Sequence, residues 1–176
     1  MAQQVLDASP QEMAQDTFAG LVRKHQAMVF SIAYSYLRDA AAAEEVAQDV
    51  FLALHRSLDT LESPQHVVNW LRRVAAHRSI DRQRRSRPLW ALDDVREPAA
   101  PAASGDPMLA GALRQLVGTL PEHPRMVMIL RYQEDMDIAE IGEILEMPEG
   151  TVKAHIHRSL KLLREKLSRR FGEISI

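Results

Sequence analysis

The sequence predicts an all-α protein of two small helical domains joined by a flexible linker. Three observations support this fold. The 176-residue chain contains only 7 glycines and is rich in Ala, Leu, Arg and Glu, which favour helices. Its apolar residues recur mostly at helical spacing, with hardly any alternating β-branched stretch. Between residues 88 and 107 this periodicity gives way to Pro, Ala, small and acidic residues, as in a linker. We therefore expect a tail at 1–16, a first domain at 17–87 and a second domain at 108–172.

The first domain is predicted to contain three helices. Asp16 or Thr17 can cap the first helix, and the second helix is expected over 39–58 with its carboxylates outward. The segment 59–65 should separate the second helix from the third, because Pro64 disfavours helical geometry in the residue before it. The residues that mark the apolar sides of the three helices are Phe18, Leu21, Val22, His25, Val29, Ile32, Ala33 and Leu37; Val46, Val50, Phe51 and Leu54; and Val67, Trp70, Leu71, Val74 and Ala75.

The second domain is predicted to contain four helices. The first should end near Gly118, the second should follow Pro121, and the third is short and ends at a tight break over 146–150. The fourth helix is long and amphipathic. The residues that mark the apolar sides of these helices are Leu109, Leu113, Leu116 and Val117; Val127 and Leu130; Ile138, Ile141, Ile144 and Leu145; and Val152, Ile156, Leu160, Leu163 and Leu167.

The last two helices have the pattern of a helix-turn-helix. An apolar stripe anchors the final helix, which leaves basic and polar side chains near its N-terminus free to enter a major groove. Gly142 in the preceding helix permits a close approach of the two helices. An ordinary helical hairpin with a solvated basic face would show much the same pattern, so this segment alone leaves both interpretations open.

The charges alternate along the chain although they nearly cancel over its length, where the formal net charge is -2. Residues 39–62 carry a net charge of -5 and residues 67–87 carry +6. The alternation repeats, with -7 over residues 133–149 and +6 over residues 153–170. Such blocks indicate separate acidic and basic surfaces, which a whole-chain count conceals.

Several classes of function are disfavoured by the sequence. The chain has no cysteine, so it has neither disulfides nor thiol chemistry. His155 and His157 lie about 200° apart around a helix and cannot grip one metal ion, and neither a phosphate loop nor a hydrolase motif is present. We therefore expect no cofactor, no metal and no enzymatic activity. The N-terminus is polar and acidic, unlike a signal peptide, and no apolar run approaches the roughly 18 residues of a membrane span. We expect a cytoplasmic protein without membrane insertion.

The third helix of the first domain is a candidate nucleic-acid surface. Its sequence, HVVNWLRRVAAHRSIDRQRRSRP, combines a tryptophan, histidines and a dense series of arginines. Arginines attract phosphates, and an aromatic ring with a preceding polar loop can capture unstacked bases. The alternative is that Trp70 belongs to the core, one turn from Val74, and that the arginines form a solvated face.

Three collinear stretches resemble the extracytoplasmic-function (ECF, group IV) RNA polymerase sigma factors of the sigma-70 family. AEEVAQDVFLALHRSL at 43–58 is similar to region 2.2 of that family, and VVNWLRRVAAHRSIDRQRR at 67–85 to regions 2.3 and 2.4. LPEHPRMVMILRYQEDMDIAEIGEILEMPEGTVKAHIHRSLKLLREKL at 120–167 is similar to region 4. The likeness covers residues 17–170 and implies a sigma-2-like helical bundle followed by a sigma-4-like helix-turn-helix.

The resemblance implies a protein that binds core RNA polymerase, recognises −10 and −35 promoter elements and promotes strand opening for transcription initiation. The polymerase contacts would be Glu45, Gln48 and Asp49. The single-stranded −10 element would be held by Leu61, Glu62, Ser63, Gln65, Trp70, Arg73, His77, Arg78, Asp81, Arg82, Arg84 and Arg85. The duplex −35 element would be read by Thr151, Lys153, Ala154, His155, His157, Arg158 and Lys161.

The chain departs from the family pattern at two of these positions. His77 stands where many members have an asparagine in the base pocket, and Ala154 replaces a commonly polar residue. The promoter sequence therefore does not follow from these residues. The family also implies an anti-sigma protein as a partner. Two alternatives from the sequence are a helix-turn-helix regulator that acts without polymerase and a helical protein-binding adaptor.

Overall fold

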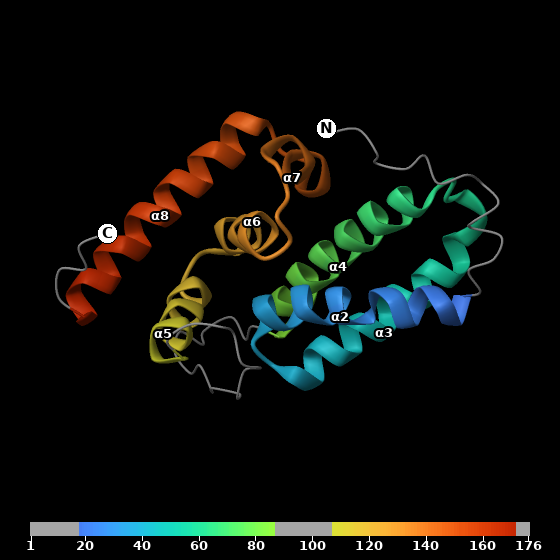
Figure 1. The fold of residues 1–176 in the computed structure, drawn as a ribbon, viewed down its shortest axis with the longest axis horizontal. Helices are drawn as coiled ribbons and strands as arrows, with labels where there is room; N and C mark the ends of the chain where they lie inside the picture. Colours follow the sequence, from blue (N-terminus) through green and yellow to red (C-terminus); the bar gives the residue numbers. More distant parts are fainter. Residues whose placement is uncertain (1–17, 87–106, 172–176) are drawn as a thin grey trace, which may run out of the picture.

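The computed structural model describes residues 18–86 and 107–171, and all the regular elements in these two ranges are helices. Helices α2, α3 and α4 make up the first domain, with the short 3-10 turn η1 before α4. Helices α5 to α8 make up the second domain (Figure 1). Their bounds are α2 Phe18–Leu37, α3 Ala40–Ser57, η1 Leu58–Thr60, α4 Pro64–Ser86, α5 Pro107–Gly118, α6 Glu122–Tyr132, α7 Ile138–Leu145 and α8 Glu149–Phe171. The all-α, two-domain prediction is confirmed. The expected caps of α2 and nearly all of the expected linker lie outside the described residues.

The first domain is a three-helix bundle in which α2, α3 and α4 pack against one another. Asp39 does not belong to α3 but caps it, because its side chain accepts a hydrogen bond from the amide of Ala42 at 3.1 Å. Pro64 is the first residue of α4, where its missing N–H costs no helical hydrogen bond. The expected break at 59–65 is thus shorter than the sequence predicts, because the helix already includes Gln65.

The second domain places α8 across the other three helices, so that α5, α6 and α7 all contact it. Helix α7 begins with a capping box, in which Asp137 accepts from the amide of Glu140 while the Glu140 carboxylate accepts from the amide of Asp137. The turn to α8 is also shorter than expected, since α8 already begins at Glu149. Within this turn Glu146, rather than a glycine, takes the left-handed conformation, with φ of 55°.

The apolar stripe of α8 differs from its prediction at one position. Leu160 is 39% exposed, whereas Ser159 is buried at 3%. The two predicted steps of four residues, from Val152 to Ile156 and on to Leu160, move the stripe around the helix, because each residue turns about 100°. The path from Val152 through Ile156 and Ser159 to Leu163 stays on one side, and Val152 and Leu163 are both buried.

The two domains pack on each other rather than standing apart. Helix α4 contacts α7, and α2 contacts both α6 and α5, so the first-domain bundle lies directly against the second domain (Figure 1). One hydrophobic cluster runs through both domains, from Leu21 in α2 and Leu71 in α4 to Met126 in α6 and Ile141 in α7. The sequence predicts two modest cores, and the structure joins most of their residues into one.

Within the described ranges, no helix is long and apolar enough to span a membrane. In the same ranges, no three His, Asp or Glu side chains converge as metal ligands.

Candidate nucleic-acid interface

The basic face of α4 borders an open cleft of about 830 Å³ between α4 and the end of α7. Six of the predicted −10 residues line it, together with Val74 of α4 and Glu146 from the turn after α7. Those of α4 lie at 73–74, 77–78, 81 and 84–85, in groups three to four positions apart, which places them along one side of the helix. The six residues that the structure brings together are Arg73, His77, Arg78, Asp81, Arg84 and Arg85.

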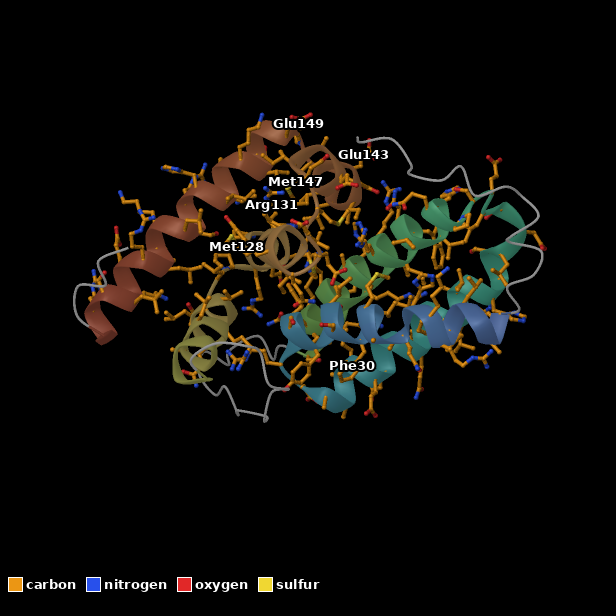
Figure 2. The ribbon with its side chains drawn as sticks, viewed as in Figure 1. Phe30, Met128, Arg131, Glu143, Met147 and Glu149 are labelled. Atoms are coloured by element: carbon orange, nitrogen blue, oxygen red, sulfur yellow. The ribbon has the colours of Figure 1, made fainter. Side chains whose placement is uncertain are left out.

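Two of these side chains contact the backbone of α7. The guanidinium Nη2 of Arg73 donates to the carbonyl of Glu143 at 2.5 Å, and Nε2 of His77 donates to the carbonyl of Ile144 at 2.8 Å. Figure 2 shows Glu143 on the side of α7 that faces α4. Both carbonyls belong to the last turn of α7, where helix carbonyls lack partners in their own helix. Side chains of the first domain therefore cap a helix of the second.

The remaining predicted −10 residues lie outside this cleft. Leu61 is buried at 4% exposure in the hydrophobic core, so its side chain does not reach the surface in this structure. Glu62 and Gln65 are exposed around the start of α4, and Ser63 accepts a hydrogen bond from the amide of His66 at 3.1 Å.

Trp70 and Arg82 also lie away from the cleft. The Trp70 ring is half-buried and packs against the hydrophobic core, as the core interpretation of the sequence expects. Arg82 faces α3 and pairs with Glu45 at 3.0 Å.

The acidic face of α3 is exposed at all three predicted polymerase-binding positions. Glu45, Gln48 and Asp49 are solvent-accessible, and Asp49 pairs with Arg78 at 3.5 Å. This ion pair and that of Glu45 are largely exposed, so each contributes little to stability and leaves the carboxylates available to a partner.

Sequence reasoning missed Leu52, which is 58% exposed one helical turn beyond Gln48 and Asp49. A large apolar residue on a carboxylate-rich helix face is the signal that would have found it. The face of Glu45, Gln48, Asp49 and Leu52 thus combines charge with an apolar anchor.

The helix-turn-helix depends on a close contact at Gly142. A Cβ at this position would lie 2.9 Å from the backbone oxygen of Met147, which is closer than real side chains approach. The same turn is closed by hydrogen bonds from the amides of Glu146 and Met147 to the carbonyl of Gly142. The expected close approach at Gly142 is therefore present, and it fixes the start of α8 against α7.

The predicted −35 residues lie along the first half of α8. Five of them are exposed: Thr151, Lys153, His157, Arg158 and Lys161. Ala154 and His155 are half-buried. Lys153 pairs with Glu149 one turn earlier at 3.5 Å, and Figure 2 shows Glu149 at the N-terminal end of α8.

The pKa of His155 is lowered from its usual value of 6.5. Burial is the main cause, and the positive charge of Arg158 and the nearby imidazole of His123 add to it. A neutral imidazole is therefore favoured in the folded domain at this point of α8.

Comparison with known proteins identifies both domains. Sigma-70 region 2 matches residues 21–88, which include α3 and α4, and Sigma-70 region 4 matches residues 110–163, which include the helix-turn-helix. The chain is 30% identical to the ECF RNA polymerase sigma factor SigW of Bacillus subtilis, over 87% of this chain and 90% of SigW. It is 29% identical to the RNA polymerase sigma factor CarQ of Myxococcus xanthus, over 93% of this chain and 94% of CarQ.

A solved structure shares the fold. The sigma factor RpoE of Bartonella quintana, in complex with the anti-sigma factor NepR, matches with a TM-score of 0.71 at 18% identity. The match covers 86% of this chain and 96% of RpoE. The two regions, in this order on an all-helical fold, define a regulator of transcription of the sigma-70 type. More particularly, the chain belongs to the ECF RNA polymerase sigma factors. Its function is that of a sigma factor in transcription initiation, and the comparisons do not favour a polymerase-independent regulator or an adaptor.

Proposed function

We propose that this protein is a group IV sigma factor that binds core RNA polymerase through α3, holds the opened −10 strand on α4 and reads the −35 duplex with α8. The observation that carries the proposal is the cationic cleft of α4 in the same chain as a helix-turn-helix. A duplex-binding regulator needs only the second of these surfaces. The first functional domain comprises residues 17–87 and the second comprises residues 108–172. The protein itself catalyses no chemical reaction.

Core polymerase docks on the face of α3 that carries Glu45, Gln48, Asp49 and Leu52. The exposed carboxylates favour a basic partner surface and speed the encounter. Leu52 supplies apolar area at the centre of the contact, where a side chain that is already 58% exposed gains most from burial.

The −10 strand lies along the cleft of α4. Arg78, Arg84 and Arg85 offer guanidinium groups to the phosphates. Arg73 and His77 contact a phosphate and a base after they release the carbonyls of Glu143 and Ile144 in α7. Flipping a base out of the duplex costs a few kcal/mol. The cleft offsets that cost through contacts that only an open strand can make, so binding favours strand opening.

The −35 duplex meets the exposed side of α8. Arg158 is exposed and can bind guanine through two hydrogen bonds, whereas Lys153 at the first turn suits a phosphate. Ala154 has no polar atom on its side chain and can contact only a thymine methyl group. Its half-buried position leaves little of that methyl group accessible.

An anti-sigma protein holds this factor inactive, and both proteins meet in the cytoplasm, where the polymerase and the promoters are. Support for this partner comes from structural relatives, since RpoE is known in complex with the anti-sigma factor NepR and CnrH in complex with the cytosolic domain of CnrY.

Core binding is tested by competition against a labelled reference sigma factor for purified core polymerase. Asp49→Lys reverses the charge at the centre of the proposed interface and should abolish competition. The matched control is Asp59→Lys, which changes an exposed carboxylate that lies outside α3. Equal competition by Asp49→Lys and the wild type, with both proteins folded by circular dichroism, would show that α3 is not the docking face.

A further inference from the structure

The first two turns of α4 carry a pair of amide side chains. Gln65 and Asn69 lie four residues apart, which places them on the same side of the helix. Nε2 of Gln65 donates to Oδ1 of Asn69 at 3.0 Å. Gln65 is a predicted −10 residue, whereas Asn69, the single asparagine of the chain, has no assigned contact with a ligand.

The start of α4 holds this amide pair in place. Pro64 is the first helical residue, and the side-chain oxygen of Ser63 accepts from the amide of His66 at 3.1 Å, as a helix cap does. Gln65 is exposed and Asn69 is half-buried. Because the helix and a mutual hydrogen bond already orient the two side chains, they lose less freedom when they bind a ligand.

The amide pair has an acceptor and a donor to spare. Within residues 18–86 and 107–171, Oε1 of Gln65 accepts no hydrogen bond from the protein and Nδ2 of Asn69 donates none. A base taken out of the stack exposes its Watson–Crick edge. On adenine this edge has an amino donor next to a ring-nitrogen acceptor, and asparagine and glutamine amides commonly pair with such a donor and acceptor of adenine.

The surroundings of Asn69 suit a base of the same strand that the α4 cleft holds. Asn69 lies one turn, about 6 Å, before Arg73, which the proposed function assigns to a phosphate. It lies eight residues, about 12 Å along the helix, before His77, so the two side chains contact different bases. Trp70, the next residue, is only half-buried, so part of it remains accessible for packing against a base.

We propose that the pair of Gln65 and Asn69 recognises an adenine of the open −10 strand. Oε1 of Gln65 accepts from the amino group of the adenine, and Nδ2 of Asn69 donates to its ring nitrogen. The inference rests on the proposed function, because only a strand held on α4 brings a base to this pair. Thymine carries its donor and acceptor in the opposite order, so the strand would have to turn that base over to make both hydrogen bonds.

The test measures oligonucleotide binding to the full chain bound to core polymerase, with core polymerase alone as background. The probes are fluorescent oligothymidine strands in which one central base is thymine, adenine, cytosine or guanine, and fluorescence anisotropy gives the affinities. Asn69→Leu removes the hydrogen-bonding group, and Asn69→Asp replaces the donor with an acceptor. The matched control is Gln26→Leu, which removes an exposed amide from α2.

We expect the wild type and the control to bind the adenine strand about tenfold more tightly than the all-thymine strand. In Asn69→Leu this ratio should fall to about one, while the affinity for the all-thymine strand stays unchanged. Asn69→Asp should favour guanine instead, because guanine presents two adjacent donors on its Watson–Crick edge to the two acceptors. A pair that only stabilises the helix would change the melting temperature and leave the base preference as it was.

Equal binding of the four strands by the wild type, or a preference for another base, would overturn the inference. So would an adenine preference that persists in Asn69→Leu. Failure of the proposed function is seen separately with the double variant Arg84→Gln and Arg85→Gln. If this variant binds every strand as tightly as the wild type, the strand does not lie on α4 and both proposals fail. If it loses binding but the wild type shows no base preference, only the inference about Asn69 fails.

Discussion

The glycine pair of the helix-turn-helix offers a prediction that depends on geometry alone. At Gly142 an added Cβ would lie 2.9 Å from the Met147 carbonyl oxygen, a backbone atom that cannot rotate away. At Gly150, inside the first turn of α8, an added Cβ would meet nothing within 4 Å. The same substitution to alanine should therefore have opposite effects at two sites eight residues apart.

The magnitudes follow from two competing terms. Alanine is favoured over glycine in a helix by about 1 kcal/mol. Overpacking against a fixed neighbour costs about 1–3 kcal/mol, and a backbone neighbour places Gly142 in the upper part of that range. We expect Gly142→Ala to lower the free energy of unfolding by about 1–2 kcal/mol, and Gly150→Ala to raise it by about 0.5–1 kcal/mol.

Thermal and urea unfolding of the two variants and the wild type measure this difference. Each kcal/mol should move the melting temperature by about 2–4 °C for a chain of this size. A Gly142→Ala variant as stable as Gly150→Ala would refute the reasoning, because the close contact between the turn and α7 would then carry no cost.

Three further predictions concern the proposed surfaces. Arg158→Ala should weaken binding to a duplex −35 element by about 1–3 kcal/mol, measured by fluorescence anisotropy. An unchanged affinity would show that Arg158 does not recognise a base. Leu52→Ser should weaken competition for core polymerase severalfold without changing the melting temperature, because the side chain is already 58% exposed. The lowered pKa of His155 means that the unfolded chain binds a proton more readily, so its contribution to stability is present above pH 6.5 and is lost as the pH falls below that value. His155→Gln should reduce this dependence between pH 7.5 and about pH 5, measured by urea unfolding, and an unchanged slope would contradict the assignment.

The helices and most of their buried faces follow from the sequence because helical periodicity is a local property. Val46, Val50 and Leu54 recur at steps of four and are all buried in α3. The exception in α8 has a geometric cause, since Ser159 rather than Leu160 continues the stripe from Ile156. A small hydroxyl residue gives no apolar signal, so the periodic pattern pointed to its larger neighbour.

The docking of the two domains could not be predicted in the same way. A local sequence pattern does not indicate which surfaces of two amphipathic bundles contact each other. In the sequence, Arg125 is a single cation before an apolar run, and nothing in that pattern indicates that it is buried between the domains. The charge blocks are visible in the sequence, but they indicate only separate acidic and basic surfaces, not that an acidic surface of one domain meets a basic surface of the other. The structure instead places Glu134 beside Arg72 and Glu122 beside Arg84.

The candidate site was partly accessible to sequence reasoning. Six −10 positions lie together because a helix repeats them along one side. Leu61 is different. The resemblance to the family implies that it contacts the −10 element, whereas its side chain is buried in the hydrophobic core. Leu52 was missed because the search for polymerase contacts considered only polar residues, although its spacing from Gln48 and Asp49 puts it on their side of the helix, where it is 58% exposed.

The central claim is that this chain directs core RNA polymerase to promoters with both of its domains. The most direct measurement is transcription in vitro from fragmented genomic DNA of the source organism, with start sites mapped in the presence and absence of the protein. We predict a limited set of starts that require the protein and share two upstream elements with a constant spacing. A transcript set identical with and without the protein, from a polymerase active with another sigma factor, would contradict the claim.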